Sequence, residues 1–150
     1  MSYTKSTLGN LNLPCSVRTL TEHDKLQVEY LDNLSGNDVK GWLNDNTDYA
    51  WGLFLDKKLI GYCTIGLADV LEFELRTFEE YTPDDLLLSD VFIDPKYRHN
   101  GFGQTMISSA ISQRNKGIDK RIFLTLLDED LQSFYLQCGF KPVCEGFMVK

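Results

Sequence analysis

The chain has 150 residues, of which 43% are hydrophobic and 25% are charged, and its formal net charge is −7 at pH 7. This length and composition predict one folded globular domain rather than a disordered chain or several domains. The negative net charge argues against non-specific binding to nucleic acid or to anionic lipid, because both repel an acidic surface.

The sequence contains neither a membrane span nor an export signal. No apolar run approaches the roughly 20 residues that a transmembrane helix needs, and the polar start MSYTKSTLGN lacks the cationic start and apolar core of a signal peptide. We therefore predict a cytoplasmic protein without a membrane partner. The cysteines at positions 15, 63, 138 and 144 form no C-x-x-C pair and no metal-ligand cluster with the two histidines, which predicts reduced thiols and no metal site.

The chain begins with a segment that carries no clear pattern. Residues 1–13 lack periodicity and are predicted to be a tail or a loosely attached segment, so the domain proper spans residues 14–150. Residues 15–20 alternate weakly as a first strand. A helix follows, for which Thr19 or Thr21 supplies the N-terminal cap.

A short helix over residues 39–43 precedes two strands over residues 51–55 and 58–67, which a tight turn joins. Both strands are apolar on both faces, which predicts a central place in a sheet. Residues 68–83 have no single period, and their acidic, aromatic composition is typical of a long functional loop or an irregular helix. Residues 69–85 hold seven acids against one arginine, which suits either a cationic ligand or a solvated surface.

The second half of the chain predicts a strand, a glycine turn and a helix in succession. The apolar strand over residues 86–93 stops at Asp94-Pro95, because proline fixes φ and has no N–H for the sheet. A basic turn with Gly101 and Gly103 then opens a helix over residues 102–115. Glycines let a ligand approach the backbone closely, and the free N–H groups of a helix start attract anions. The turn is therefore a candidate phosphate site.

The rest of the chain predicts another buried strand over residues 121–127, a helix that ends at Gly139, and closing strands over residues 140–143 and 147–149. Six basic side chains lie between residues 95 and 121, against one aspartate, which suits an anionic ligand near the glycine turn.

Two known phosphate-binding patterns do not fit the glycine turn. The dinucleotide fingerprint needs a third glycine where the chain has Met106, and the P-loop needs lysine and a hydroxyl residue where Gly103 is followed by Gln104 and Thr105. The remaining pattern, Arg98-x-x-Gly101-x-Gly103 between a strand and a helix, resembles the pyrophosphate loop Q/R-x-x-G-x-G/A of the GNAT superfamily of N-acetyltransferases.

A second segment resembles the same superfamily. Phe134-Tyr135 and Gly139-Phe140 reproduce the signature F-Y-x-x-x-G-F, with a helix, a glycine cap and a strand in the expected order. On spacing alone Tyr135 is a core tyrosine, which shares one helix face with Leu131, Phe134 and Cys138. The two matches together identify residues 15–150 as similar to the GNAT superfamily.

The resemblance implies a fold and a cosubstrate. The implied fold is a mixed α/β fold whose central twisted sheet is flanked by helices, with acetyl-coenzyme A between two splayed parallel strands, here residues 86–93 and 121–127. The pantetheine would pair with the backbone of the first strand, and the pyrophosphate would take amides from the loop. The corresponding residues are Val91, Phe92, Ile93, Arg98, His99, Asn100, Gly101, Phe102, Gly103 and Gln104.

The resemblance also implies an acid for the departing thiolate. The family's tyrosine matches Tyr135, whose phenol is protonated at neutral pH. Direct attack by an amine needs a base as well. Asp90 lies within an apolar strand, where burial would raise its pKa, so it is the best candidate for the base, directly or through water. The alternative is that Asp90 is structural and pairs with an arginine or with backbone N–H groups.

The implied activity is acetyl transfer from acetyl-coenzyme A to a primary amine of a small molecule or peptide. The alternative is a noncatalytic acyl-coenzyme A binding or regulatory module of the same fold, because Asp128 and Leu131 stand where many members have asparagine and alanine. Asp128 is also explained as a helix cap. The sequence names neither the acceptor amine, which the acidic segment predicts to be cationic, nor the oligomeric state, for which a homodimer is one option.

Overall fold

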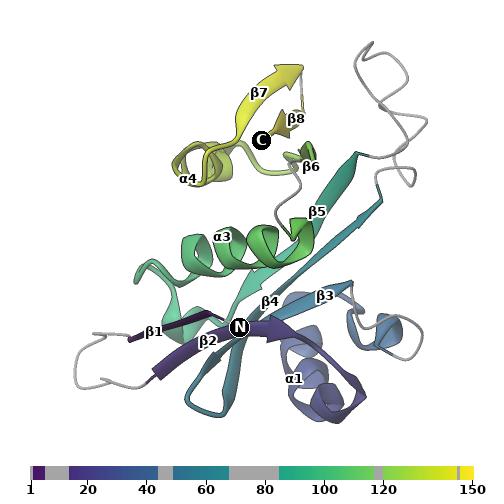
Figure 1. Ribbon diagram of the computed structural model, residues 1–150, viewed down its shortest axis with the longest axis vertical. Coiled ribbons are helices and arrows are strands. Elements are labelled where there is room, and N and C mark those ends of the chain that lie inside the picture. Colours follow the sequence, from purple (N-terminus) through teal and green to yellow (C-terminus); the bar gives the residue numbers. More distant parts are fainter. Residues whose placement is uncertain (1, 6–13, 44–48, 68–84, 117–119, 145) are drawn as a thin grey trace.

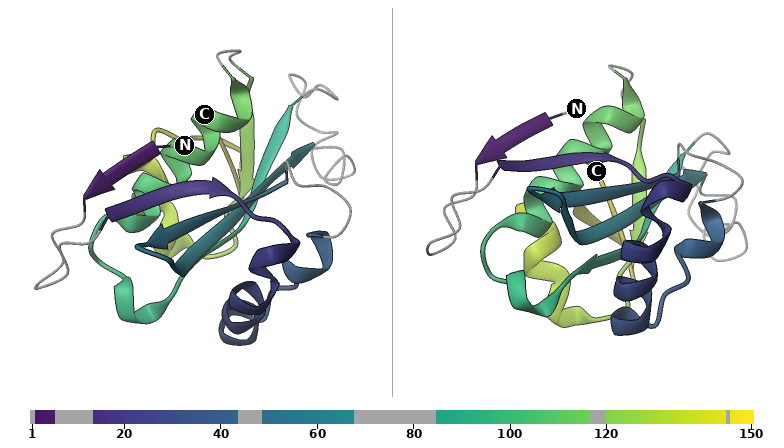
Figure 2. Two further views of the ribbon diagram at one scale, coloured as in Figure 1. Left: turned by 60° about the horizontal axis from the view of Figure 1, so that its bottom comes forward. Right: turned by 90° about the horizontal axis from the view of Figure 1, so that it is seen from below.

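The computed structural model describes residues 2–5, 14–43, 49–67, 85–116, 120–144 and 146–150. One sheet of eight strands, in the order β1-β2-β3-β4-β5-β6-β8-β7, carries helices on both of its faces (Figures 1 and 2). Neighbouring strands run antiparallel except β5 and β6, which run parallel. The prediction of a mixed sheet flanked by helices is confirmed.

The strands are β1 (Ser2–Lys5), β2 (Pro14–Thr19), β3 (Ala50–Leu55), β4 (Lys58–Leu67), β5 (Leu86–Ile93), β6 (Ile122–Thr125), β7 (Lys141–Cys144) and β8 (Phe147–Val149). The helices are α1 (Lys25–Ser35), α3 (Phe102–Asn115) and α4 (Gln132–Gln137), with short 3-10 turns at Glu22–Asp24, Lys40–Trp42, Pro95–Tyr97 and Glu129–Leu131. None of the helices in these ranges is long and apolar enough to cross a membrane.

The N-terminal segment, for which the sequence predicts a tail or a loosely attached piece, contributes the edge strand β1. Ser2–Lys5 pairs antiparallel with β2, from Ser2 opposite Val17 to Lys5 opposite Pro14. Residues 6–13 lie outside the described residues, as do residues 68–84, which include most of the acidic segment. Weak alternation in a four-residue strand explains why the sequence pattern does not reveal it.

The sheet separates the apolar clusters on its two faces, of which two contain the helices. The larger joins α3 and α4 to the inner strands and includes Met106, Ile107 and Tyr135. The smaller packs α1 against β3 and β4 and includes Val28, Leu31 and Tyr62. Figure 2 shows α1 and α3 on opposite sides of the sheet. The two faces of the sheet therefore carry different helices.

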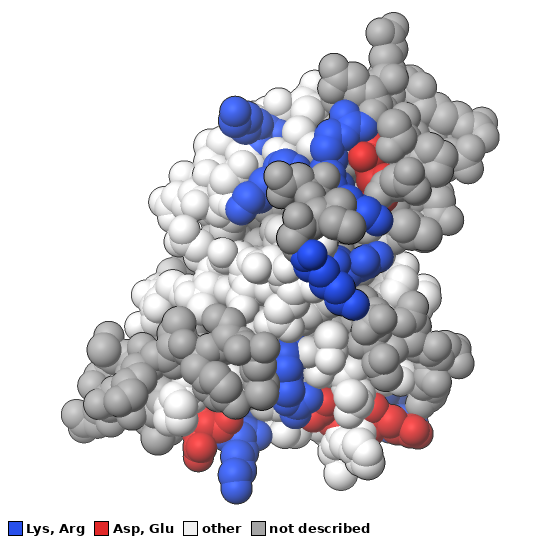
Figure 3. All heavy atoms as spheres, in the orientation of Figure 1, with Lys and Arg blue, Asp and Glu red and all other residues white. Residues whose placement is uncertain are grey.

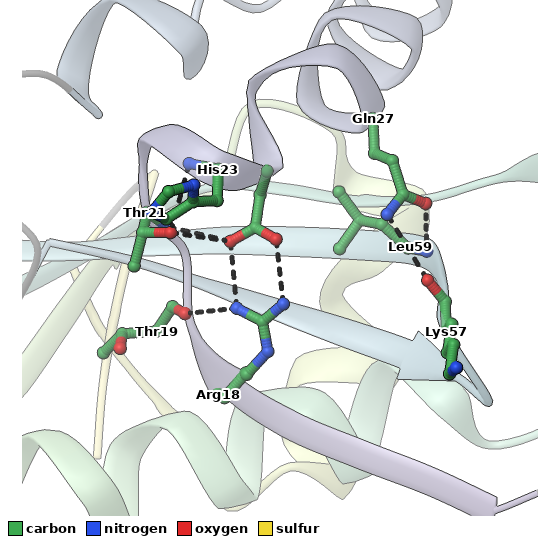
Figure 4. Close-up of polar contacts among 8 residues, drawn as sticks. Arg18, Thr19, Thr21, His23, Gln27, Lys57 and Leu59 are labelled. Atoms are coloured by element: carbon green, nitrogen blue, oxygen red, sulfur yellow. Dashed lines mark hydrogen bonds and ion pairs between the residues drawn. The ribbon is translucent and has the colours of Figure 1, made fainter.

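Polar contacts fix α1 on its face of the sheet (Figure 4). The Asp24 carboxylate accepts hydrogen bonds of 2.8 and 2.9 Å from the Arg18 guanidinium, and it also accepts one from the N–H of Thr21. One turn later the Gln27 side chain donates to the carbonyl of Lys57 and accepts from the N–H of Leu59, at the turn between β3 and β4. These bonds set the direction in which α1 runs.

Candidate active site

The parallel pair β5 and β6 is joined only at its beginning. The ladder consists of Leu86 opposite Ile122 and Leu87 opposite Phe123. Just before it, the Arg121 guanidinium donates to both oxygens of the buried Asp85 carboxylate, at 3.1 and 2.7 Å. After this clamped end the two strands have no further ladder between them. The sequence-based expectation of two splayed parallel strands agrees with this geometry.

A cavity of about 500 Å³ lies where the strands part. Its walls come from residues 87–91 of β5, residues 124–128 at the end of β6, Leu131 and Tyr135, and from Asn37 beyond α1. The cavity thus brings together Asp90 and Tyr135, the two residues that the sequence analysis selected for catalysis. The two residues come from different elements, a strand and a helix.

Asp90 forms a bulge in β5. On β4 the paired positions Tyr62 and Thr64 are two residues apart, whereas their partners Phe92 and Ser89 on β5 are three residues apart. The extra residue lets Asp90 adopt φ 52°, a left-handed conformation that aspartate and asparagine tolerate better than most residues. The bulge interrupts the regular alternation of β5 and places the Asp90 side chain among the residues that line the cavity.

The Asp90 carboxylate accepts a hydrogen bond from a hydroxyl group. Among the described residues it is not paired with an arginine or with backbone N–H groups, which were the partners expected if Asp90 had a purely structural role. Thr64 Oγ1 lies 3.1 Å from Asp90 Oδ2 and 2.7 Å from Ser89 Oγ. Because each hydroxyl has one proton, Ser89 donates to Thr64 when Thr64 donates to Asp90. Burial raises the pKa of the Asp90 carboxyl, the bond from Thr64 opposes that shift, and the negative charge of Asp32 adds to it. A raised pKa makes Asp90 a better proton acceptor.

Tyr135 lies on α4 with 9% of its surface exposed. Its ring packs edge-on against Phe134 and Phe140, at centroid distances of 5.1 and 6.0 Å. Burial, together with the nearby thiols of Cys138 and Cys63, raises the pKa of Tyr135 to about 12. The phenol is therefore protonated over the whole physiological pH range, and it is available as a hydrogen-bond donor in the cavity.

The predicted phosphate loop has three of its side chains turned back onto the protein. Arg98 Nε donates to the carbonyl of Ile93 at 2.8 Å, and its guanidinium lies 5.1 Å from the centre of the Phe92 ring. Asn100 Nδ2 donates to the carbonyl of Arg98 at 2.7 Å, and Gln104 Nε2 donates to the carbonyl of Gln137. In this arrangement the loop presents backbone amides rather than charged side chains to a ligand.

The backbone of the loop suits an anion at the start of α3. His99 and Gly101 have φ values of 66° and 79°, which turn the chain sharply before the helix. The first bond of the helix runs from the N–H of Thr105 to the carbonyl of Gly101, so the amides of the first turn have no acceptor within the helix. A Cβ added to Gly101 would meet no atom within 4 Å, which leaves space beside these amides.

Gly103 and Phe102 have packing roles. A Cβ on Gly103 would lie 3.0 Å from Cζ of Phe134, so the absence of a side chain lets α3 approach α4 closely. Phe102 is buried in the larger cluster, where it anchors the first turn of α3. Of the β5 residues predicted to pair with pantetheine, Val91 and Ile93 pack toward the same cluster, whereas Phe92 packs on the α1 face.

The basic segment between residues 95 and 121 does not form one site. The helix α3 separates Lys96 and Arg98, at its beginning, from Arg114 and Lys116, at its end, by a span of about 20 Å at 1.5 Å per residue. Figure 3 shows lysine and arginine side chains gathered over the C-terminal end of α3, away from the phosphate loop. Arg121 pairs with Asp85. One residue of the basic segment 95–121 and one residue of the acidic segment 69–85 therefore form a structural ion pair with each other.

The two positions that depart from the family pattern have separate roles. Asp128 Oδ1 accepts from the N–H of Asp130 at 2.9 Å, so Asp128 caps the turn before α4, as the sequence suggested. Leu131 lines the cavity together with Tyr135, but it is 45% exposed and lies in the 3-10 turn Glu129–Leu131, before the α-helix begins.

Other residues of the site gave little signal in the sequence. Thr64 and Ser89 are hydroxyl residues within apolar strands. They are recognised as a polar pair only when the register between β4 and β5 is known, because that register places them opposite each other. Asn37 reaches the cavity because the carboxylate of Asp32 accepts hydrogen bonds from the N–H groups of Val39 and Lys40, which fixes the chain after α1.

No group of three His, Cys, Asp or Glu side chains that could hold a metal ion occurs within the described ranges. Cys63 and Cys138 are buried free thiols, and Cys15 is also buried. The side chain of Cys144 lies outside the described part of the chain.

Comparison with known proteins agrees with the fold. The model of the acetyltransferase (GNAT) family matches residues 16–140. Comparison of the sequence with those of curated proteins gives no significant match. A GNAT-family acetyltransferase from Listeria monocytogenes has a similar structure, with a TM-score of 0.69, 16% identity, and coverage of 99% of this chain and 97% of the other.

Two further solved structures are similar and contain ligands. A diaminobutyrate acetyltransferase from Paenibacillus lautus, in complex with L-2,4-diaminobutyric acid and coenzyme A, has a TM-score of 0.65 and 13% identity, covering 91% of this chain and 94% of the other. NAA60 of Arabidopsis thaliana, in complex with a bisubstrate analogue, has a TM-score of 0.65 and 15% identity, covering 91% and 97%. At these identities the likeness shows the fold.

Proposed function

Because the chain belongs to the GNAT family of acetyltransferases, we propose that it transfers the acetyl group of acetyl-coenzyme A to the primary amine of a small molecule or peptide. The observation that carries this proposal is the cavity between the parted strands, which is lined by both a half-buried carboxylate, Asp90, and a protonated phenol, Tyr135. Solved relatives of the same fold with coenzyme A and an amine substrate support the choice of ligands.

The proposed reaction assigns one proton to each of these groups. The amine attacks the acetyl carbon as a neutral nucleophile, and Asp90 takes the proton that its ammonium form loses, directly or through water. The carbon–sulfur bond then breaks while the nitrogen releases its second proton to water, and Tyr135 donates a hydrogen bond to the departing thiolate. The raised pKa of Asp90 favours the first role, because a carboxylate at its ordinary pKa is a weak base.

The loop before α3 is proposed to hold the pyrophosphate. The amides at the start of α3 and the open space beside Gly101 support this role. In this proposal, the backbone of residues 91–93 faces the pantetheine, and His99, Asn100, Gly101, Phe102, Gly103 and Gln104 contribute main-chain rather than side-chain contacts. Arg98 uses Nε for its bond to the carbonyl of Ile93, and its two terminal nitrogens form no hydrogen bond to any described residue, so these nitrogens are the part of the guanidinium proposed to reach a phosphate.

The direct test is an amine panel. Purified protein is mixed with acetyl-coenzyme A and with polyamines, aminoglycosides, amino acids or peptides, and the release of free thiol is followed. Turnover with at least one class is expected, and tight coenzyme binding without turnover on any amine would contradict the proposal. That second result would favour a noncatalytic binding module, which the Asp128 carboxylate at the cavity wall would suit. A cytoplasmic location stays a prediction from the sequence.

A further inference from the structure

The cavity has two different faces, because it passes between strands of one sheet. Along β5, Leu86 and Leu88 belong to the cluster under α3, whereas Leu87 belongs to a cluster on the other face. Along β6 and its extension, Leu124 and Leu126 face α3 in the same way. Strand alternation therefore directs Leu127, the next residue, toward the α1 face.

The helix that begins at the phosphate loop lies on the α3 face, as does Tyr135. A coenzyme whose phosphates lie at that loop therefore enters from the α3 face. The opposite entrance of the cavity, on the α1 face, is left for the acceptor. Asn37 lies beside this entrance, since it follows α1 and lines the cavity.

The acceptor entrance is apolar at one side. Leu127 is 92% exposed and lines the cavity. The chain is held extended here by the bond from the N–H of Leu126 to the carbonyl of Gly146, at 2.7 Å. An exposed leucine that is fixed at the mouth of a cavity offers its surface to a ligand. The charged residues that line the cavity, Asp90 and Asp128, are both acids.

We propose that the acceptor is a primary amine carried on an apolar group, with its amino nitrogen toward Asp90 and its apolar part against Leu127. This inference rests on the proposed acetyl transfer, and it names the substrate class. One carboxylate near the acetyl group suits one amino group, and the leucine at the entrance suits an alkyl or aryl body. A polyamine would place its second ammonium against Leu127, which offers it no partner, and the neighbouring Asp128 carboxylate already accepts a hydrogen bond from the N–H of Asp130.

The experiment uses two matched series of probes with acetyl-coenzyme A. Butylamine, hexylamine and octylamine are compared with 1,4-diaminobutane, 1,6-diaminohexane and 1,8-diaminooctane. The expected result is that kcat/KM rises about two- to fourfold for each CH₂ of the monoamines, where fourfold corresponds to full burial. Each diamine should fall below the monoamine of equal length. Equal or better diamines, or no dependence on length, would overturn the inference.

Variants locate the apolar contact. Leu127→Asn, a nearly isosteric change, should flatten the length dependence and leave the KM for acetyl-coenzyme A within about twofold, whereas Leu26→Asn, at a leucine 83% exposed on α1 and away from the cavity, should change neither. If Leu127→Asn instead raises the coenzyme KM alone, Leu127 contacts the coenzyme and the inference is wrong.

A binding measurement separates this inference from the proposed reaction. Calorimetry of the same amines with the protein–coenzyme A complex should rank octylamine ahead of 1,8-diaminooctane without any turnover. That ranking with no acetylation of any amine would contradict the transferase and support the apolar entrance. Acetylation of diamines in preference to monoamines would support the transferase and overturn the apolar entrance.

Discussion

Replacing Tyr135 by phenylalanine tests the role of the phenol, and the structure gives the size of the expected effect. The pKa of Tyr135 is about 12, and that of an ordinary thiol is about 8.5. Complete proton transfer from the phenol to a thiolate is therefore uphill by roughly 5 kcal/mol. A donated hydrogen bond to the departing sulfur is the better description, and a bond to a charged group contributes about 1.5–3 kcal/mol. We expect kcat to fall about 10- to 150-fold.

The same substitution should leave the fold intact. None of the residues that the structure describes forms a hydrogen bond with the Tyr135 hydroxyl, and phenylalanine keeps the ring contacts with Phe134 and Phe140. The free energy of unfolding should change by less than about 1 kcal/mol. Steady-state kinetics and thermal melts of Tyr135→Phe are compared with those of Tyr30→Phe, at an exposed tyrosine of α1. A kcat within threefold of wild type would refute the reasoning.

Four further variants test the base, the glycines and the acidic segment. Asp90→Asn keeps the left-handed conformation and removes a carboxylate whose folded pKa is raised, so it should lower kcat. It should also stabilise the protein by an amount that grows as the pH rises from the ordinary carboxyl pKa to the raised one and stays constant above it. A pH series of melts in which the variant gained no stability at neutral pH would contradict this. The wild-type rate should rise with pH through the same raised pKa. Gly103→Ala should lower the melting temperature, because the added Cβ would crowd Phe134. Gly101→Asn should chiefly weaken coenzyme A binding measured by calorimetry, because asparagine tolerates positive φ. Equal effects of the two variants on stability would contradict this division between a packing glycine and a binding glycine. Replacing the four glutamates of residues 69–85 by glutamine should raise the KM for cationic amines, with added salt acting likewise, and unchanged kinetics at low and high salt would make this segment a solvated surface.

The sequence by itself determined the main elements and the family resemblance. Proline after Ile93 ends β5, and the glycines before α3 mark the loop, because both residue types restrict or release the backbone locally. Apolar runs identified β3 and β4 as central strands and β5 as a buried strand, because burial on both faces of a sheet excludes most polar residues. The two motifs around Gly101 and Tyr135 then implied the fold and its cosubstrate.

Only the tertiary structure decided how polar and charged residues are used. Asp90 is singled out by a bulge that depends on the register between β4 and β5, and Thr64 becomes its partner only through that pairing. Asp85 and Arg121 belong to opposite charge clusters in the sequence, yet they pair at the clamped end of the cavity. Leu127 reads as an ordinary strand leucine until the parting of β5 and β6 leaves it exposed. Each of these roles depends on contacts between distant segments, which local patterns of residues do not encode.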